Sequence, residues 1–246
     1  MPIYDFIIIG LGTAGSATCM TLARRGFRVL GIDKHRPPHA MGSHHGASRS
    51  VRRAYLEGTA YVPMALKSWE LWRKLERDSG WDLLVETGNL TIGPPDSPAV
   101  AGFMASAQTY DIPHAVLNAS EVRKKWPQLV LPDTFVAGLE KAAGIVFPEL
   151  SIKTFLAEAE KAGADLAFDE PLNRWSEEHG HVYVHTARSA YETGRVLISA
   201  GAWTSGLLDL PINRLQTKRV PVHWLSLIHI SEPTRRTIPS RMPSSA

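Results

Sequence analysis

The sequence begins with an apolar strand that runs into a glycine-rich turn. Residues 4–10 read YDFIIIG, and Gly10-Leu11-Gly12-Thr13-Ala14-Gly15 completes a GxGxxG pattern. A helix is expected over residues 14–25, followed by a second apolar strand over residues 27–33. A strand, a tight turn, a helix and a strand within about 30 residues form a βαβ unit, which requires a parallel sheet.

The three glycines suit the binding of a dinucleotide. Gly10 permits the tight turn, Gly12 lets a pyrophosphate approach the backbone, and Gly15 allows the helix to pack closely on the strand. The phosphates would lie at the helix N-terminus. Asp33, 18 residues after Gly15, would accept hydrogen bonds from the adenosine ribose and repel a 2′-phosphate, which disfavours NADP. The pattern does not separate FAD from NAD, and a plain glycine turn with a capping aspartate remains the alternative.

The middle of the chain differs in character from its beginning. An amphipathic helix is expected over residues 61–78, with its tryptophans as core anchors. Residues 83–147 show short strands in irregular order. Two helix starts are expected among them, one at Ser97-Pro98 and one at a capping box of Asn118 and Glu121. A mixed α+β domain inserted into the first domain would explain this change.

The α/β alternation returns after residue 148. A helix is expected over residues 150–161 and strands near residues 166–168, 182–185 and 195–200. The dinucleotide-binding domain is therefore assigned residues 1–80 and 148–211, and the inserted substrate domain residues 81–147 and 212–224. Residues 225–235 resemble the translation of a transposon adapter used in sequencing libraries. We thus expect residues 225–246 to be disordered or a translation artefact, and both domains to be incomplete at the C-terminus.

Composition narrows the possible partners and compartment. Most of the net charge of +3 comes from the last 22 residues, and the rest holds 24 of the 27 basic and 23 of the 24 acidic residues, which argues against nucleic-acid binding. No apolar run approaches the length that a bilayer requires, and no basic leader precedes the first strand. The single cysteine, Cys19, is expected in the core. We expect a cytoplasmic protein that does not bind membranes.

A segment rich in Pro, Gly and His separates the second strand from the amphipathic helix. It contains Pro37-Pro38-His39 and Gly42-Ser43-His44-His45-Gly46-Ala47-Ser48-Arg49, and Arg52, Arg53 and Tyr55 follow. Taken alone, the histidines could belong to a solvated loop or a metal site, and the arginines to an exposed cluster. No third ligand occurs at metal-binding spacing, so no metal site is expected.

These residues together resemble the family of monomeric sarcosine oxidases and N-methyltryptophan oxidases. The likeness continues in order through Gly88, Trp126-Pro127, Gly144 and Gly201-Ala202-Trp203, and covers about residues 3–224. The resemblance implies an α/β fold with an FAD-binding, Rossmann-like parallel-sheet domain, an inserted mixed α+β substrate domain, and FAD as the cofactor.

The resemblance also implies roles for particular residues. His45 and Arg49 would lie against the isoalloxazine ring and stabilise its anionic reduced form, and Arg52 would hold the substrate carboxylate. The backbone amide and carbonyl of Leu172 would recognise the adenine, and Gly201 would let a strand approach the cofactor closely. The expected cofactor-binding residues are Gly10, Gly12, Thr13, Ala14, Gly15, Asp33, Lys34, Gly42, Ser43, His44, Leu172 and Gly201.

The activity implied is oxidation of an N-methyl amino acid by dioxygen, with an imine that hydrolyses to the amino acid and formaldehyde, and hydrogen peroxide as the second product. The family suggests a monomer. Its flavin-bonding cysteine and oxygen-facing lysine have no match in this sequence, so we expect the chain alone to be a poor enzyme. The alternatives are a glycine or D-amino acid oxidase, and a dinucleotide-binding module without turnover.

Overall fold

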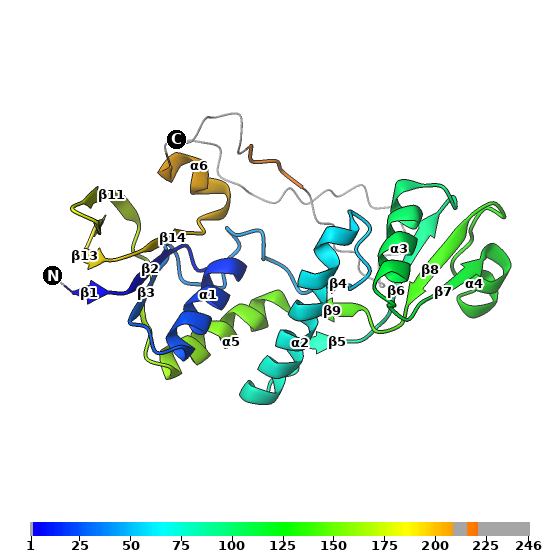
Figure 1. Cartoon of the computed structure of the whole chain (residues 1–246), viewed down its shortest axis with the longest axis horizontal. Helices are drawn as coiled ribbons and strands as arrows, with labels where there is room; N and C mark the ends of the chain where they lie inside the picture. Colours follow the sequence, from blue (N-terminus) through cyan, green and yellow to red (C-terminus); the bar gives the residue numbers. More distant parts are fainter. Residues whose placement is uncertain (1, 209–215, 221–246) are drawn as a thin grey trace, which may run out of the picture.

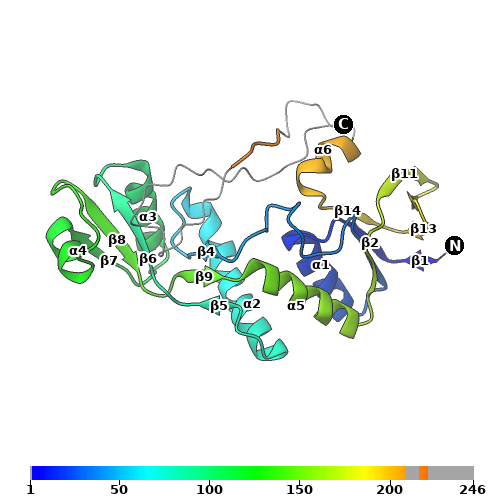
Figure 2. The same cartoon turned by 180° about the vertical axis from the view of Figure 1, so that it is seen from behind.

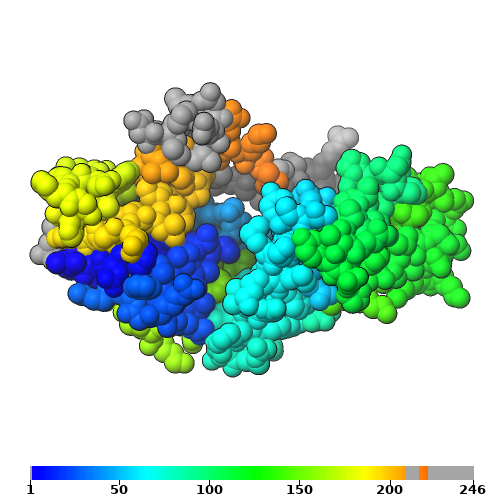
Figure 3. Space-filling model, in the orientation of Figure 1, coloured from blue at the N-terminus to red at the C-terminus, as the bar shows by residue number. Residues whose placement is uncertain are grey.

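A computed structural model describes residues 2–208 and 216–220 of the chain. Over these residues the molecule is elongated, with a parallel sheet and its covering helices toward one end and an antiparallel sheet at the other (Figures 1 and 2). The helix α2 (Val62–Ser79) lies between the two ends. The space-filling view shows the same division, with residues near the N-terminus packed beside those around residues 190–205 (Figure 3).

The parallel sheet confirms the βαβ unit expected from the sequence. Its strand order is β10-β3-β2-β14, from β10 (Asp165–Ala167), β3 (Val29–Ile32), β2 (Phe6–Ile9) and β14 (Val196–Ile198), and every neighbouring pair is parallel. The helix α1 (Thr13–Arg24) connects β2 to β3. The carboxyl ends of β2, β3 and β14 therefore meet at one edge, where ligands bind in sheets of this type.

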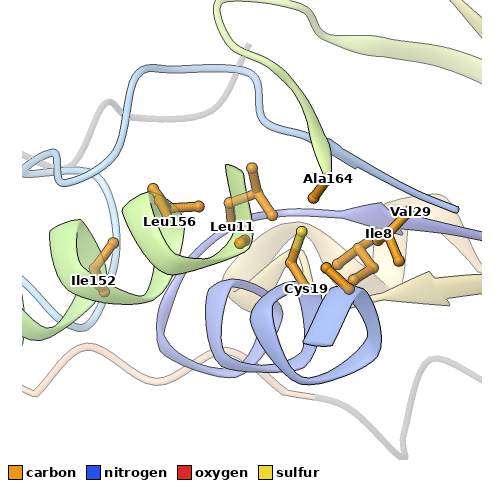
Figure 4. Packing of buried hydrophobic residues seen from close by; sticks show 9 residues of the cluster. Ile8, Leu11, Cys19, Val29, Ile152, Leu156 and Ala164 are labelled. Atoms are coloured by element: carbon orange, nitrogen blue, oxygen red, sulfur yellow. The ribbon is translucent and has the colours of Figure 1, made fainter. Parts of the chain in front are cut away.

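Two helices cover one face of the parallel sheet. The helix α5 (Pro148–Lys161) packs beside α1, and the core between them and the sheet is built from apolar side chains of all three (Figure 4). The labelled members are Ile8, Leu11, Cys19, Val29, Ile152, Leu156 and Ala164. Cys19 is fully buried there, and this burial raises the pKa of its thiol to about 12. The full burial of Cys19 in this cluster confirms the prediction that it is a core residue. A thiol that stays protonated is also a poor nucleophile.

A mixed sheet, parallel between β1 and β13 and antiparallel elsewhere, covers the opposite face. Its order is β1-β13-β12-β11, and the second core cluster joins Ile7 and Ile9 of β2 to Val184 of β12. The strands are β1 (Ile3–Tyr4), β13 (Ala190–Thr193), β12 (His181–Thr186) and β11 (Leu172–Glu178). Sequence analysis expected β12 but missed β11 and β13, because β11 is mostly exposed and lacks the apolar alternation of a half-buried strand.

Two smaller sheets contain the strands of the inserted region, and one of them also includes a strand at residues 49–51, which precedes that region in the chain. One has the order β4-β9-β5, from β4 (Arg49–Val51), β9 (Gly144–Val146) and β5 (Leu84–Val85). The other has the order β6-β8-β7, from β6 (Asn89–Gly93), β8 (Val136–Glu140) and β7 (Ala115–Asn118), and all its pairs are antiparallel. The fold class is therefore as expected: an α/β parallel-sheet domain with a mixed α+β insertion.

Two helix starts in the insertion confirm their sequence signals. Ser97 caps α3 (Pro98–Thr109) by accepting a hydrogen bond from the backbone of Val100. Asn118 and Glu121 form a reciprocal capping box at α4 (Ala119–Lys125). The short elements η1 (Thr59–Tyr61), η2 (Gly201–Trp203) and α6 (Thr204–Leu207) complete the described chain. The assigned domain boundaries stay predictions, and residues 212–215 and 221–246 lie outside the described residues.

Candidate active site

The glycine turn at the end of β2 leaves no room for a side chain at Gly10 or Gly15. Gly10 has a φ of +92°, and a Cβ on it would lie 2.7 Å from the carbonyl oxygen of Ser199, next to β14. A Cβ on Gly15 would overlap the carbonyl oxygen of Gly10. Gly12 precedes α1 and no side chain caps the helix there. The first turn of α1, with exposed Thr13 and Ala14, therefore presents backbone N–H groups that suit a diphosphate.

Asp33 joins the glycine turn to the end of β3. Its side chain is buried and accepts hydrogen bonds from the backbone N–H of Leu11, at 2.7 Å, and of His35, at 2.8 Å. Its carbonyl oxygen accepts a third from the backbone of Glu170, at 3.0 Å. A carboxylate has lone pairs beyond those used here, so Asp33 can still accept from a ribose hydroxyl.

A pair of histidine rings lies beside this turn. His44 is buried, its ring centroid is 5.2 Å from that of His39, and its Nδ1 would be 3.6 Å from a Cβ placed on Gly12. Burial, followed by the neighbouring His39, lowers the pKa of His44. The buried Nε2 atom of His44 has no hydrogen-bond partner. A buried polar atom of this kind, next to a glycine that keeps the helix start open, fits a bound polar group such as a cofactor diphosphate.

The loop from Gly42 to Arg49 is held against the start of α5. Glu149, in the first turn of α5, lies 3.0 Å from Nδ1 of His45 and accepts a hydrogen bond of 3.1 Å from the backbone of Gly46. The Gly46 bond is the main cause of the lowered pKa of Glu149, and His45 adds to it. Arg49 donates to the carbonyl oxygens of Ser43 and His45, at 2.9 and 2.7 Å. The loop thus has a defined shape.

Two cavities adjoin this loop. The first, of about 150 Å³, lies between the N-termini of α1 and α5 and is lined by residues that include Thr13, Ser43, His44 and Arg49. The second, of about 290 Å³, is lined by Ser50, Val51, Arg52, Tyr55, Tyr61, Met64, Ala65, Ser68 and Trp72. Trp72 of α2 lines both. Arg49, expected at the flavin, and Arg52, expected at the substrate carboxylate, therefore line neighbouring cavities, whereas His45 lines neither.

Arg52 lines the second cavity but is already paired. Its Nη2 atom donates to both carboxylate oxygens of Glu57, at 2.7 and 3.0 Å, and its guanidinium carbon lies 5.0 Å from the Tyr55 ring centroid. Its Nε is buried without a hydrogen-bond partner. Glu57 is half exposed, at 50% for its side chain, so solvent screens this pair and a substrate carboxylate can compete for the guanidinium.

Lys34, Leu172 and Gly201 are among the expected residues that line neither cavity. Lys34 is exposed beside Asp33. Leu172 begins β11 and packs with the second core cluster, two residues after Glu170, whose backbone is bonded to Asp33. Gly201 has a φ of +55° and no atom within 4 Å of a Cβ built on it, so its backbone conformation, and not a close neighbour, requires glycine there.

Sequence analysis missed Trp72 and Glu149 as site residues. Trp72 was expected to be a core anchor; it does pack near Phe155, with ring centroids 5.5 Å apart, but it also faces both cavities. The sequence did contain a signal for Glu149: its acidic side chain directly follows Pro148, at the start of an expected helix, where a carboxylate is stabilised.

The described residues contain neither a membrane-spanning helix nor a cluster of metal ligands. None of their helices is both long and apolar enough to cross a lipid bilayer. No group of three or more His, Cys, Asp or Glu side chains among them is arranged to hold a metal ion.

Comparison with known proteins agrees with this geometry. The sequence model of the DAO family, described as FAD dependent oxidoreductase, matches residues 5–242. A monomeric sarcosine oxidase of Streptomyces avermitilis is 42% identical over 235 residues, which are 95% of this chain and 61% of the relative. An N-methyl-L-tryptophan oxidase of Citrobacter koseri is 39% identical over 210 residues, 85% of this chain and 56% of the relative. The chain thus spans little more than half the length of these relatives.

Solved structures share the fold over most of the described chain. The open form of NikD, an unusual amino acid oxidase essential for nikkomycin biosynthesis, has a TM-score of 0.77 at 27% identity, covering 85% of this chain and 54% of that one. A glycine oxidase from Geobacillus kaustophilus matches at 22% identity with a TM-score of 0.68. The match covers 84% of this chain and 58% of the oxidase, and supports the fold alone. From the glycine turn, the fold and these matches together, the chain belongs to the family of FAD-dependent oxidoreductases.

Proposed function

We propose that the protein containing this chain is an FAD-dependent oxidase that demethylates an N-methyl amino acid of the sarcosine or N-methyltryptophan type. One observation carries the proposal: Arg52 lines a cavity that shares Trp72 with the cavity at the N-terminus of α1. A fixed cation beside a flavin site suits a substrate that carries both an oxidisable amine and a carboxylate. The names of the two curated relatives support this substrate class.

The proposed cofactor contacts follow the geometry of the turn and the loop. Gly10, Gly12, Thr13, Ala14 and Gly15 would hold the diphosphate at α1, with His44 beside it. Asp33 and Lys34 would face the adenosine ribose, and Leu172 the adenine. Gly42, Ser43 and Gly201 would border the rest of the cofactor. When bound, FAD would supply the hydride acceptor and, in its reduced form, the electron donor to dioxygen.

The protein's own side chains would orient the substrate and set the charge of the site. Arg52 would exchange Glu57 for the substrate carboxylate and so fix the position of the carbon next to the amine. Arg49 and His45 would place positive charge near the flavin ring, where negative charge develops during oxidation. Both are held by the same loop, since Arg49 donates to the carbonyl oxygen of His45.

The experiment is to express the intact gene and test the purified protein for a flavin absorption band and for peroxide release. Sarcosine, N-methyltryptophan and pipecolate probe the proposed class; glycine and D-alanine probe the alternative amino acid oxidases. We expect flavin and peroxide with at least one secondary amine. Peroxide only with the primary amines would replace the proposal with a glycine or D-amino acid oxidase. Bound flavin without any peroxide would favour a binding module.

The expectation that the 246-residue chain alone turns over poorly stays a prediction. The same assay, run on this chain and on the product of the intact gene at equal flavin content, tests it. Equal rates of peroxide release per flavin would refute it.

A further inference from the structure

We infer that Glu140, at the end of β8 in the antiparallel sheet, is a positioning residue for Arg52 and determines which of two adjacent arginines is available to a carboxylate. The inference rests on the proposed function, because it concerns how the substrate carboxylate is bound. Glu140 is fully buried, although ionisable side chains are seldom buried completely unless they are paired. It belongs neither to the glycine turn nor to the lining of either cavity.

The carboxylate of Glu140 is directed at the chain immediately after Arg52. The backbone N–H of Arg53 lies 3.1 and 3.2 Å from its two oxygens, and the backbone N–H of Ala54 donates to it at 3.0 Å. Nε of Arg53 donates to it as well, at 3.0 Å. Residues 52–58 form no strand or helix, so these N–H groups need an acceptor outside regular secondary structure. Glu140 supplies it.

Two further contacts from the same domain hold the next residues of this segment. The hydroxyl of Ser106, in α3, donates to the carbonyl oxygen of Tyr55 at 2.5 Å. The carbonyl of Leu56 lies so close to Gly102 of α3 that a Cβ on that glycine would overlap its oxygen. The inserted domain therefore contacts the segment at Arg53, Ala54, Tyr55 and Leu56. These contacts fix the path of the backbone that bears Arg52.

Glu140 also separates the two arginines by charge. Arg53 is committed to a buried carboxylate and stacks over Trp69, 5.2 Å from its ring centroid. Within the described part of the chain, the one carboxylate paired with Arg52 is that of Glu57, whose side chain is half exposed. A substrate carboxylate can replace the solvent-screened partner, whereas removal of Arg53 from Glu140 would leave a buried charge uncompensated. Glu140 thus holds Arg53 in a structural ion pair, and Arg52 is the arginine that can bind the substrate carboxylate.

The test is Glu140→Gln in the full-length flavoprotein, assayed with its best substrate and with the carboxamide of that substrate. Gln retains the size of the side chain but removes the charge and one acceptor oxygen. We expect KM for the carboxylate substrate to rise about tenfold while KM for the carboxamide changes little, so that discrimination between them falls. Glu158→Gln is the matched control, because it removes an ion-paired carboxylate on α5, bonded to Arg24 and away from both cavities.

Ser106→Ala keeps the experiment decisive if Glu140→Gln does not fold. It removes one hydrogen bond to the same segment, leaves the buried ion pair intact, and is expected to lower discrimination in the same direction by a smaller factor. Arg52→Ala, assayed in parallel, separates the two claims. Unchanged discrimination in Arg52→Ala would overturn the proposed carboxylate role itself. Lost discrimination in Arg52→Ala with unchanged discrimination in the folded Glu140→Gln would overturn only the positioning role of Glu140. If Glu140→Gln is unfolded, unchanged discrimination in Ser106→Ala would overturn the premise of that role, which is that contacts from the inserted domain to residues 53–56 position Arg52.

Discussion

The side chain of Asp33 accepts a hydrogen bond of 2.7 Å from the backbone N–H of Leu11, so the end of β3 is tied directly to the glycine turn after β2. Asp33, which is expected to bind the ribose, therefore also holds the glycine turn that is expected to bind the diphosphate. The ribose and the diphosphate of an ADP group would therefore contact one hydrogen-bonded unit, and a change at Asp33 should affect folding and cofactor binding together.

Asp33→Ala is therefore expected to weaken both properties. Leu11 and His35 lose their acceptor, and because the Leu11 N–H is buried the free energy of unfolding should fall by about 1–3 kcal/mol. Loss of the ribose contact should also weaken FAD binding by at least about tenfold. Urea denaturation and a flavin titration measure the two effects. Asp5→Ala is the control, because Asp5 accepts a backbone hydrogen bond from Arg28 at an exposed site. Equal FAD affinity in both variants would contradict the role of Asp33.

Gly12→Ala and Gly15→Ala should separate binding from folding. A Cβ on Gly12 meets only the His44 ring at an ordinary 3.6 Å, and the φ of −68° at Gly12 suits alanine. This variant should fold with near-normal stability but lose FAD affinity, because its methyl group occupies the approach to the helix start. Gly15→Ala should lower the free energy of unfolding, because the new Cβ overlaps the carbonyl oxygen of Gly10. Thermal unfolding and flavin content distinguish the outcomes. Unimpaired FAD binding by Gly12→Ala would place the diphosphate elsewhere.

Arg52→Ala should raise KM strongly, because a charged hydrogen bond to the substrate carboxylate is removed. Such bonds contribute about 1.5–3 kcal/mol, which corresponds to roughly 10- to 150-fold in KM. Arg52→Lys should recover only part of this, since lysine lacks the planar fork. Steady-state peroxide assays of the full-length protein give both values. An unchanged KM in Arg52→Ala would remove the carboxylate role.

The stability of the fold should fall as the pH decreases below the unperturbed pKa of histidine. Burial and His39 lower the pKa of His44 in the folded state below its ordinary value of 6.5, while Asp33 and Glu149 oppose this shift. Between the folded and unfolded pKa values the unfolded state binds more protons, so the free energy of unfolding decreases with decreasing pH. His44→Gln should flatten this decrease.

Urea denaturation of the cofactor-free protein between about pH 7.5 and 5.5 measures the effect, at values above the range where carboxylates such as Glu149 titrate. His179→Asn, in the exposed turn after β11, is the control, and asparagine tolerates the φ of +53° there. The same pH dependence in wild type and His44→Gln would assign the titration to another group.

Local signals predicted the first half of the parallel-sheet domain well. The turn from Gly10 to Gly15, the helix after it and Asp33 are contiguous, so pattern and spacing were sufficient; α1 begins and ends one residue earlier than expected. The helix starts at Ser97 and Asn118 were predicted equally well, because a helix cap depends on residues only three positions apart in the sequence.

The sequence could not predict contacts that depend on the tertiary fold. Glu140 lies 87 residues from Arg53, and no local pattern indicates that its carboxylate is buried against that backbone. The contact between Glu149 and the loop at His45 spans 104 residues and depends on how α5 packs. Similarly, the mixed sheet that covers the second face of the parallel sheet was only partly predicted, because its strand β11 is largely exposed.

The most direct test of the central claim is a crystal structure of the full-length protein with FAD bound. We predict electron density for the diphosphate against the backbone N–H groups that begin α1, and for the flavin ring beside His45 and Arg49. FAD bound at another surface, or in this cleft with both basic side chains turned into solvent, would contradict the account.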